Sequence, residues 1–283
     1  MGMTPRALAF ATLLSLLPAA ASAFQLETDP TGAPVRFEQQ EVVFRLPARI
    51  PSGLEAEDVE AAIQNALGTW AEVSGLKLTL VPGDAQAKQG YDPAGNNHND
   101  ILFVESGWEW DDGAVGVTVL TLNTRTHQIL DADIVLNAAQ HRFRTLPEKS
   151  VAGGIYDDVQ NVLTHELGHA LGLAHSEIAQ ATMYPASPRG ETSKRALQAD
   201  DIDGVRALYQ PSSTAPVPTN PAEGVQGVAR GMASVGCSSS GEGAAPMAVG
   251  LLMAALALRA LGRRHRPVPL LIESESITRR PRA

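Results

Sequence analysis

Eleven consecutive residues, His165 to His175, constrain this chain more than any other stretch. They read H-E-L-G-H-A-L-G-L-A-H. His165 and His169 are four residues apart, so on a helix their imidazoles lie on one face and can bind the same metal ion. Gly172 permits a left-handed exit from that helix, which lets His175 return as a third ligand. The stretch therefore predicts a helix that carries a three-histidine metal site.

The residue types in this stretch favour Zn²⁺ as the metal. Three neutral imidazoles suit zinc, and they leave a fourth coordination position for water, as in catalytic rather than structural zinc sites. Glu166 follows the first histidine and lies beside the metal without binding it, where a general base is needed. Two histidines at helical spacing also occur by chance. A chance match to the full pattern, with the glycine and the third histidine at fixed offsets, is about a thousandfold rarer than one to H-E-x-x-H alone.

The motif and the residues after it resemble the metzincin zinc endopeptidases, and most closely their matrixin branch. Eight residues beyond His175, the run 181–185 reads A-T-M-Y-P, similar to the matrixin form A-x-M-Y-P. The resemblance implies that Met183 forms a tight turn beneath the three ligands without binding the metal. It also implies that residues 184–188 form a wall of the pocket for the side chain after the scissile bond. The run 200–209, D-D-I-D-G-V-R-A-L-Y, is similar to the last matrixin helix.

Hydrophobic periodicity predicts an α+β domain. Strands are expected over 35–46, 76–81, 100–105, 114–122 and 129–137, and helices over 52–72, 157–172 and 197–209. The resemblance implies a metzincin-like catalytic domain, in which a twisted mixed β-sheet packs against a long backing helix, an active-site helix and a C-terminal helix. In this likeness the run from Val115 to Leu120 is the edge strand above the cleft. An exposed edge can bind an extended peptide by strand addition.

A second group of polar residues offers ligands for structural ions, with Ca²⁺ the candidate cation because hard cations prefer oxygen. Its members are His98, Asn99, Asp100, Asp111, Asp112, Asp131 and Asp133. The alternative is that they are solvated turn residues and strand-end caps. Turns favour Asn and Asp, so this alternative is preferred for any single residue of the group. His98, His127 and His141 are scattered along the chain and are expected to be surface histidines rather than ligands of a second zinc.

The charge distribution excludes nucleic acid as a partner. Residues 24–210 carry 13 Lys and Arg against 27 Asp and Glu, a net charge of −14, whereas the whole chain is −9. Binding to phosphates needs a basic face, which this acidic part does not provide. An acidic folded part suits an extracellular protein that holds calcium, because hard cations prefer carboxylate oxygens.

The two ends of the chain carry targeting signals. Residues 1–23 have a positive start, a short apolar core and an A-S-A ending, typical of a signal peptide cut after Ala23. Residues 24–210 would form the matrixin-like domain, 211–243 a flexible linker, 244–262 a transmembrane segment and 263–283 a basic cytoplasmic tail. Cys237 lies in a run, G-C-S-S-S-G, which together with the span and arginines resembles the C-terminal sorting tails (MYXO-CTERM type) of myxobacteria. We therefore expect an exported protein, extracellular or anchored at the cell surface.

The resemblance implies a secreted or surface-anchored zinc metalloendopeptidase (EC 3.4.24 type). The competing hypothesis is a surface-anchored, zinc-containing binding or adhesion module without peptidase activity. Glu166 argues against the module, because a structural zinc site has no use for a general base. The only cysteine, Cys237, follows the motif, so latency through an upstream thiol is not expected.

Overall fold

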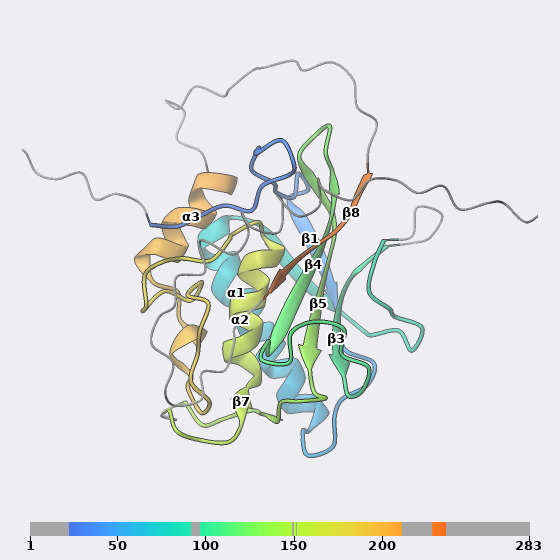
Figure 1. Ribbon diagram of the computed structural model, residues 1–283, viewed down its shortest axis with the longest axis vertical. Coiled ribbons are helices and arrows are strands. Elements are labelled where there is room, and N and C mark those ends of the chain that lie inside the picture. The colour runs from blue at the N-terminus through green and yellow to red at the C-terminus, as the bar shows by residue number, and fades with distance from the viewer. Residues whose placement is uncertain (1–22, 92–96, 149, 151, 211–227, 236–283) are drawn as a thin grey trace, which may run out of the picture. The chain divides into compact units, whose positions relative to one another are not determined.

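The computed structural model describes residues 23–91, 97–148, 150, 152–210 and 228–235 (Figure 1). The helices are α1 (Ala56–Ser74), α2 (Val159–Ala170) and α3 (Ala199–Tyr209), with a short 3₁₀ helix η1 (Ser193–Arg195). The strands are β1 (Glu41–Arg45), β2 (Lys77–Val81), β3 (Asn99–Val104), β4 (Gly116–Asn123), β5 (Gln128–Asn137), β6 (Phe143–Arg144), β7 (Asp157–Asp158) and β8 (Val228–Val235).

Six strands form one mixed sheet in the order β2-β1-β3-β5-β4-β8. Strands β2, β1, β3 and β5 run parallel to one another. Strand β4 pairs antiparallel with β5, and β8 pairs antiparallel with β4. Strands β6 and β7 form a separate two-stranded ladder. The parallel part of the sheet is formed by long crossovers, one of which contains α1, so residues distant in sequence become neighbours.

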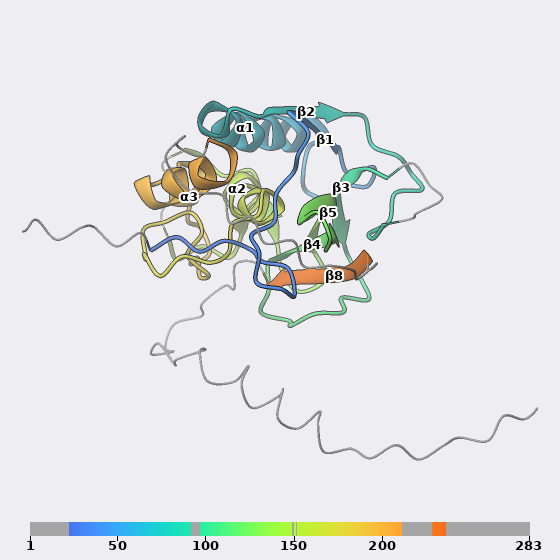
Figure 2. The same ribbon diagram turned by 90° about the horizontal axis from the view of Figure 1, so that it is seen from above.

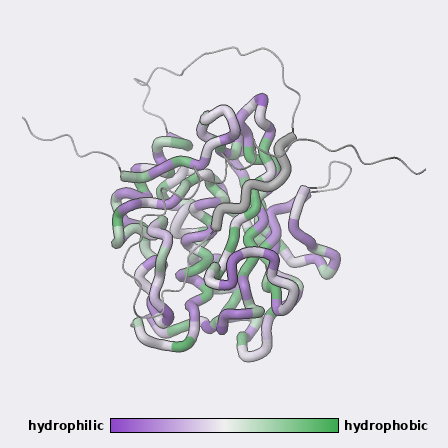
Figure 3. The backbone as a smooth tube through the Cα atoms, viewed as in Figure 1, coloured by the Kyte–Doolittle hydropathy of each residue, from purple (hydrophilic) through white to green (hydrophobic). Residues whose placement is uncertain are grey.

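The helices gather on one side of the sheet, with α1 and α2 side by side (Figure 2). Helix α1 buries an apolar stripe that includes Ile63, Leu67 and Trp70, and it ends at Gly75 in the left-handed conformation, with φ of 78°. The apolar residues along β4, β5 and α2 form the core between the layers, while the connecting loops are largely hydrophilic (Figure 3). Helix α2 thus lies in the middle of the domain and contacts both α1 and the sheet strands β4 and β5.

The predicted α+β class, the mixed sheet and the three helices are confirmed. The observed elements begin and end within a few residues of the predicted ranges, except that the first strand is shorter, at Glu41–Arg45. Residues 35–37 before it are buried but pair only through an isolated bridge between Arg36 and Gln128.

One part of the predicted linker differs from expectation. Residues 228–235 form the strand β8, because the outer edge of β4 offers backbone hydrogen bonds that need no apolar side chains. Several predicted segments lie outside the described residues: all but the last residue of the predicted signal peptide 1–23, the Cys237 motif, the predicted span 244–262 and the predicted tail 263–283. Among the residues that the structure describes, no helix is long and apolar enough to cross a membrane.

Candidate metal centre

Helix α2 is held by a local cap at its N-terminus and by a contact from α1 along its length. Asp158 caps it, because its Oδ1 accepts a hydrogen bond of 2.8 Å from the backbone N of Asn161. Farther along, the indole N–H of Trp70 on α1 donates to the carbonyl of Thr164, at 2.7 Å. This contact lies one residue before the first histidine of the motif. The helix that presents the site is therefore held by α1 as well as by its own cap.

The three histidines converge. Their ligand atoms all lie within 4.8 Å of one another, and this is the one group of three or more potential metal ligands among the described residues. His165 and His169 are completely buried, and their ring centroids are 4.9 Å apart. His175 reaches both rings from the loop after the helix, with centroid distances of 5.4 and 4.8 Å. The predicted ligands are thus brought together as the sequence spacing required.

Backbone carbonyls select the tautomer of two of these rings. The Nδ1 of His165 lies 2.6 Å from the carbonyl of Thr182, and that of His169 lies 2.8 Å from the carbonyl of Leu173. A carbonyl only accepts, so each Nδ1 carries the proton and each Nε2 keeps its lone pair. The Nε2 atoms of His165 and His175 are buried and have no hydrogen-bond partner in the structure.

The surroundings favour the neutral form of two of the rings, those of His165 and His175. Burial, and then the nearby Lys194 ammonium, lower the pKa of His165 well below its ordinary value. Burial followed by the neighbouring histidine lowers the pKa of His175 to about 3. Buried lone pairs on neutral imidazoles are the donors that zinc prefers, and leaving them unsatisfied in the interior is costly. The residues present therefore fit a zinc ion.

Two glycines of the motif are required by close packing. Gly172 has φ of 96°, and a Cβ there would lie 2.3 Å from the carbonyl oxygen of Val35. At Gly168 a Cβ would lie 2.2 Å from Sδ of Met183 and 2.9 Å from the Trp70 ring. The methionine thus packs against the helix at Gly168, between the positions of His165 and His169.

The N-terminal segment straps the loop that carries the third ligand. The backbone N of Glu27 donates to the carbonyl of Gly172 at 2.8 Å, and the N of Ala174 donates to the carbonyl of Gln25 at 2.9 Å. The Glu27 carboxylate also lies 3.5 Å from Nδ1 of His169. Residues near the start of the domain therefore fix the helix exit from outside.

Asp201 of α3 holds the methionine turn from the other side. Its carboxylate accepts hydrogen bonds from the backbone N of Thr182 at 2.8 Å and of Met183 at 2.9 Å, and also from the N of Gln198 at 2.8 Å. The sequence predicted only that Asp201 lies near the start of a helix. Its contact with the turn was not predicted, because the partners lie 18 and 19 residues away in sequence.

Glu166 is completely buried and lies against β4. The hydroxyl of Thr118 is 2.8 Å from its Oε2 and 3.0 Å from its backbone carbonyl. A Cβ at Gly116 would lie 2.8 Å from Oε1, so only glycine leaves room for this carboxylate. Thr118 was missed by the sequence reasoning, since a threonine on a strand carries no signal of such a contact.

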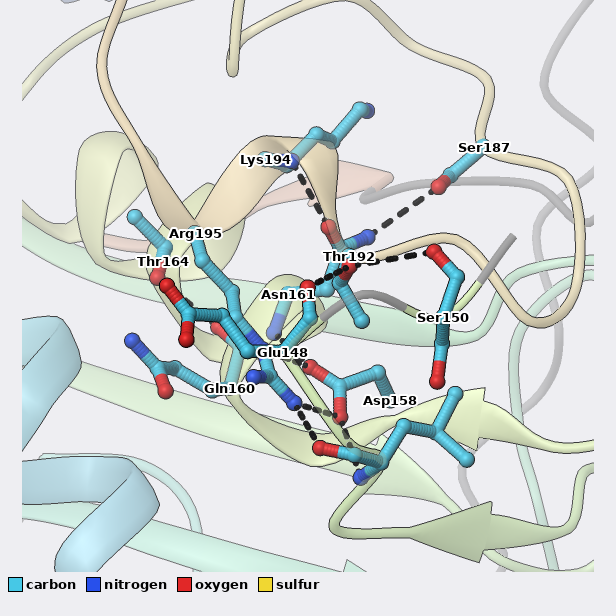
Figure 4. A network of polar contacts seen from close by, with 11 residues as sticks. Glu148, Ser150, Asp158, Gln160, Asn161, Thr164, Ser187, Thr192, Lys194 and Arg195 are labelled. Atoms are coloured by element: carbon cyan, nitrogen blue, oxygen red, sulfur yellow. Dashed lines mark hydrogen bonds and ion pairs between the residues drawn. The ribbon is translucent and has the colours of Figure 1, made fainter. Parts of the chain in front are cut away.

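A polar network ties the start of α2 to the segment after the methionine turn (Figure 4). The side chain of Asn161 accepts from the backbone N of Lys194 at 2.8 Å and donates to the hydroxyl of Ser187 at 3.1 Å. The guanidinium of Arg195 donates to both carboxylate oxygens of Asp158, at 2.8 and 2.5 Å. The loop is thereby fixed on the helix that carries the ligands.

Lys194 fixes the same loop through its side chain. The residue is buried, and its Nζ donates to the carbonyl of Tyr184. This contact holds residues 184–188, the segment expected to wall a substrate pocket.

The candidate ligands of a structural ion mostly bind the protein itself. Asp100 pairs with Arg45 through two hydrogen bonds of 2.5 and 2.7 Å, and Asp133 accepts from the backbone N of Asp100 and Gly90. Asp131 is also buried, and its Oδ2 has no hydrogen-bond partner in the structure. Burial raises the pKa of both Asp131 and Asp133, and the mutual repulsion of these neighbouring carboxylates raises that of Asp131 further.

The prediction that His141 lies at the surface is wrong. Its side chain is buried, with Nδ1 3.0 Å from a carboxylate oxygen of Asp157 and Nε2 3.1 Å from the carbonyl of Asp112. The ring bridges two loops and both of its nitrogens are used, so it packs as a structural residue. His127 is partly exposed and lies 2.7 Å from Asp29.

The chain is similar in sequence to known proteins of one family. The family model for Matrixin matches residues 36–210. Metalloendoproteinase 5-MMP of Arabidopsis thaliana is 30% identical over 162 residues, which are 56% of this chain and 41% of that protein. Neutrophil collagenase of Homo sapiens is 28% identical over 200 residues, 66% of this chain and 36% of that protein. A 52-residue stretch is 52% identical to Metalloendoproteinase 1 of Glycine max, covering 18% of this chain and 17% of that protein. The chain thus spans less than half the length of these relatives.

Gly172→Ala is expected to destabilise the domain and weaken zinc retention, because a methyl group there meets the Val35 carbonyl at a left-handed residue. Gly53→Ala is the matched control, since Gly53 has φ of 89° with nothing within 4 Å. The control should cost about 1 kcal/mol from backbone strain and Gly172→Ala about 3 kcal/mol or more. Thermal unfolding and metal analysis measure both. Equal losses for the two variants would show that the close approach is unimportant.

The acidic pair predicts a pH-dependent stability. Because the folded pKa of Asp131 is raised, its contribution is fully present below the unfolded value of 3.8 and is lost as the pH rises through the folded pKa. Asp131→Asn should therefore flatten the fall in melting temperature between pH 5 and pH 8 at a fixed zinc concentration. Asp203→Asn, at an exposed position of α3, is the control and should keep the wild-type slope. An unchanged slope in Asp131→Asn would contradict the assignment.

Proposed function

The chain belongs to the matrixin family, and on that premise we propose that it is a zinc-dependent endopeptidase that hydrolyses peptide bonds in proteins. One observation carries the proposal: three imidazoles converge, two of them fully buried, and the residue after the first is a buried glutamate whose carboxylate is held by a strand of the sheet. The ligands alone would suit a structural ion. The positioned carboxylate adds the base that hydrolysis needs.

In this proposal His165, His169 and His175 hold the zinc through their Nε2 atoms. Zinc bound there would lower the pKa of a water molecule towards about 7 and polarise the carbonyl group under attack. The carbonyls of Thr182 and Leu173 contribute by holding two of the rings in the required tautomer. Met183 supports the ligands from beneath.

Glu166 is proposed as the general base and then the general acid. Its carboxylate takes the proton from the attacking water and later delivers it to the departing amine, so the proton count balances over the cycle. Thr118 acts as a positioning residue. A hydroxyl has one proton, and a hydrogen bond to a carboxylate is stronger than one to a backbone carbonyl. The Thr118 hydroxyl therefore donates to Oε2 of Glu166 and orients the carboxylate.

The substrate is proposed to be a protein segment in extended form. The outer edge of β4 runs beside Glu166, since Thr118 and Gly116 both contact that carboxylate. A peptide added to this edge by backbone pairing would bring one of its carbonyl groups to the histidines. Residues 184–188, which Lys194 and Asn161 hold in place, would receive the side chain after the scissile bond.

We also propose, from the sequence pattern alone, that the protein is exported and attached to the membrane or cell surface through its C-terminal segment. The signal-peptide pattern over residues 1–23 and the apolar run 244–262 support this. N-terminal analysis of the exported protein should give Phe24 as the first residue. Retention of residues 1–23 would contradict export by this route.

Glu166→Gln is expected to keep zinc and lose at least about 10³ of the cleavage rate, because the isosteric amide cannot accept the proton. The test digests a peptide library with the wild type and the variant, each with and without a chelator. Metal analysis of both preparations should give one zinc per chain, and it would also detect bound calcium at the second group of candidate ligands.

The same experiment separates the peptidase from a zinc-containing binding or adhesion module. A module would hold zinc in both preparations and cleave nothing in either. If Glu166→Gln cleaves peptides as fast as the wild type, the protein is still a peptidase, but the proposed role of the Glu166 carboxylate is overturned.

Thr118→Val is expected to lower kcat about tenfold or more while KM stays within about twofold, because it removes one hydrogen bond to a charged group without changing the shape of the side chain. Thr118→Ser, which restores a hydroxyl, should recover most of the rate. Zinc content should not change in either variant. A loss in kcat that serine does not rescue would indicate a packing defect rather than positioning.

A further inference from the structure

Strand β8 occupies the outer edge of β4. The two strands pair antiparallel, with Val117 opposite Val235, Thr118 opposite Ser234, and the ladder continuing to Asn123 opposite Val228. A register shift interrupts the ladder between Leu120 and Leu122. In Figures 1 and 2 the strand lies alongside β4 at the end of the sheet. The edge that the sequence predicted to be open is therefore covered by the chain itself.

The covered edge is the part of the sheet nearest to the proposed general base. Thr118, opposite Ser234, hydrogen-bonds the Glu166 carboxylate, and Gly116, next to Val117, leaves the room for it. The C-terminal end of β8 is thus level with the residues that contact Glu166. Its N-terminal end lies at the far end of β4.

A backbone edge can pair with only one strand at a time. Each residue of β4 that points outward offers one N–H and one C=O, and β8 uses these groups along most of the strand. We propose that β8 is an intramolecular ligand of the substrate-binding edge, which competes with peptide substrates until it detaches. This inference rests on the proposed endopeptidase function, because it assumes that substrates pair with β4.

The sequence explains why this segment rather than another forms the strand. Prolines stand at 211, 216, 218 and 221, and the next is Pro246. Proline has no N–H and is excluded from paired strand positions, so the proline-free residues 222–245 are the first after the domain that can add to an edge. Strand β8 lies inside this stretch.

The tether makes the competition effective. Seventeen residues, 211–227, connect the end of the described domain to β8. An intramolecular connection of about this length gives an effective local concentration in the millimolar range. A peptide that binds the same edge must compete with that value, so the apparent KM rises while kcat at saturation is unchanged.

The test weakens β8 in the full chain without touching the domain. Successive N–H groups of a strand point to opposite edges, so one of two adjacent residues must donate to β4. Met232→Pro combined with Ala233→Pro therefore removes at least one hydrogen bond of the ladder. Ser212→Pro combined with Ser213→Pro, outside β8, is the matched control. For a peptide substrate, the first pair should lower KM at least about fivefold with kcat within about twofold, and the control should match the wild type.

A second readout does not depend on activity. Hydrogen exchange of β4 should be faster in the Met232→Pro/Ala233→Pro variant than in the control, because the outward amides lose their acceptors. Deletion of residues 228–235 repeats the change without an added proline and should give the same KM and exchange.

The outcomes are distinct. Unchanged KM and unchanged exchange in both β8 variants of an active enzyme would overturn the inference. Faster exchange with no cleavage by any preparation would support the strand pairing and overturn the endopeptidase function. Activation by Cys237→Ser without activation by the β8 variants would overturn the strand competition and point instead to a thiol that binds the metal.

Discussion

The structure depends on the convergence of three imidazole rings, two of which, His165 and His169, are completely buried. A buried ring nitrogen is costly unless it has a hydrogen-bond or metal partner. Here the Nδ1–H groups of His165 and His169 donate to backbone carbonyls. That assignment directs the Nε2 atoms inward. The arrangement consequently fits a divalent metal, and many surrounding contacts hold the rings in place.

Those surrounding contacts come from every part of the domain. Trp70 anchors α2 from one side, Asp201 fixes the methionine turn from another, and Thr118 fixes the carboxylate from the sheet. None of them touches the metal position. Together they make the site a product of the whole fold, so the backing helix, the sheet and the last helix are each needed for the chemistry that the motif residues would perform.

The ligands and the general base could be predicted because their relation is local. A helix has a fixed period, and His165, Glu166 and His169 occupy three positions of it. Gly172 could be interpreted in the same way, since a positive φ at a helix exit is a short-range property. The number and type of the main elements followed from periodicity for the same reason.

Thr118, Asp201 and His141 could not be predicted, because each acts on a partner that only the tertiary structure brings near. A threonine on a strand, an aspartate at a helix start and a lone histidine have common, bland roles. Strand β8 was missed because it pairs with β4, a strand about a hundred residues earlier in the sequence. The proline-free stretch 222–245 limits where such a strand can form, but the residues of the two strands do not show that they pair with each other.

The strap formed by residues 25–27 has a consequence for the order of assembly. It contacts residues 172–174, which lie far from it along the chain. Contacts between remote segments are expensive in chain entropy and form late in folding. The third imidazole is therefore among the last groups to be locked, and an incomplete polypeptide emerging from synthesis would lack a finished ligand set.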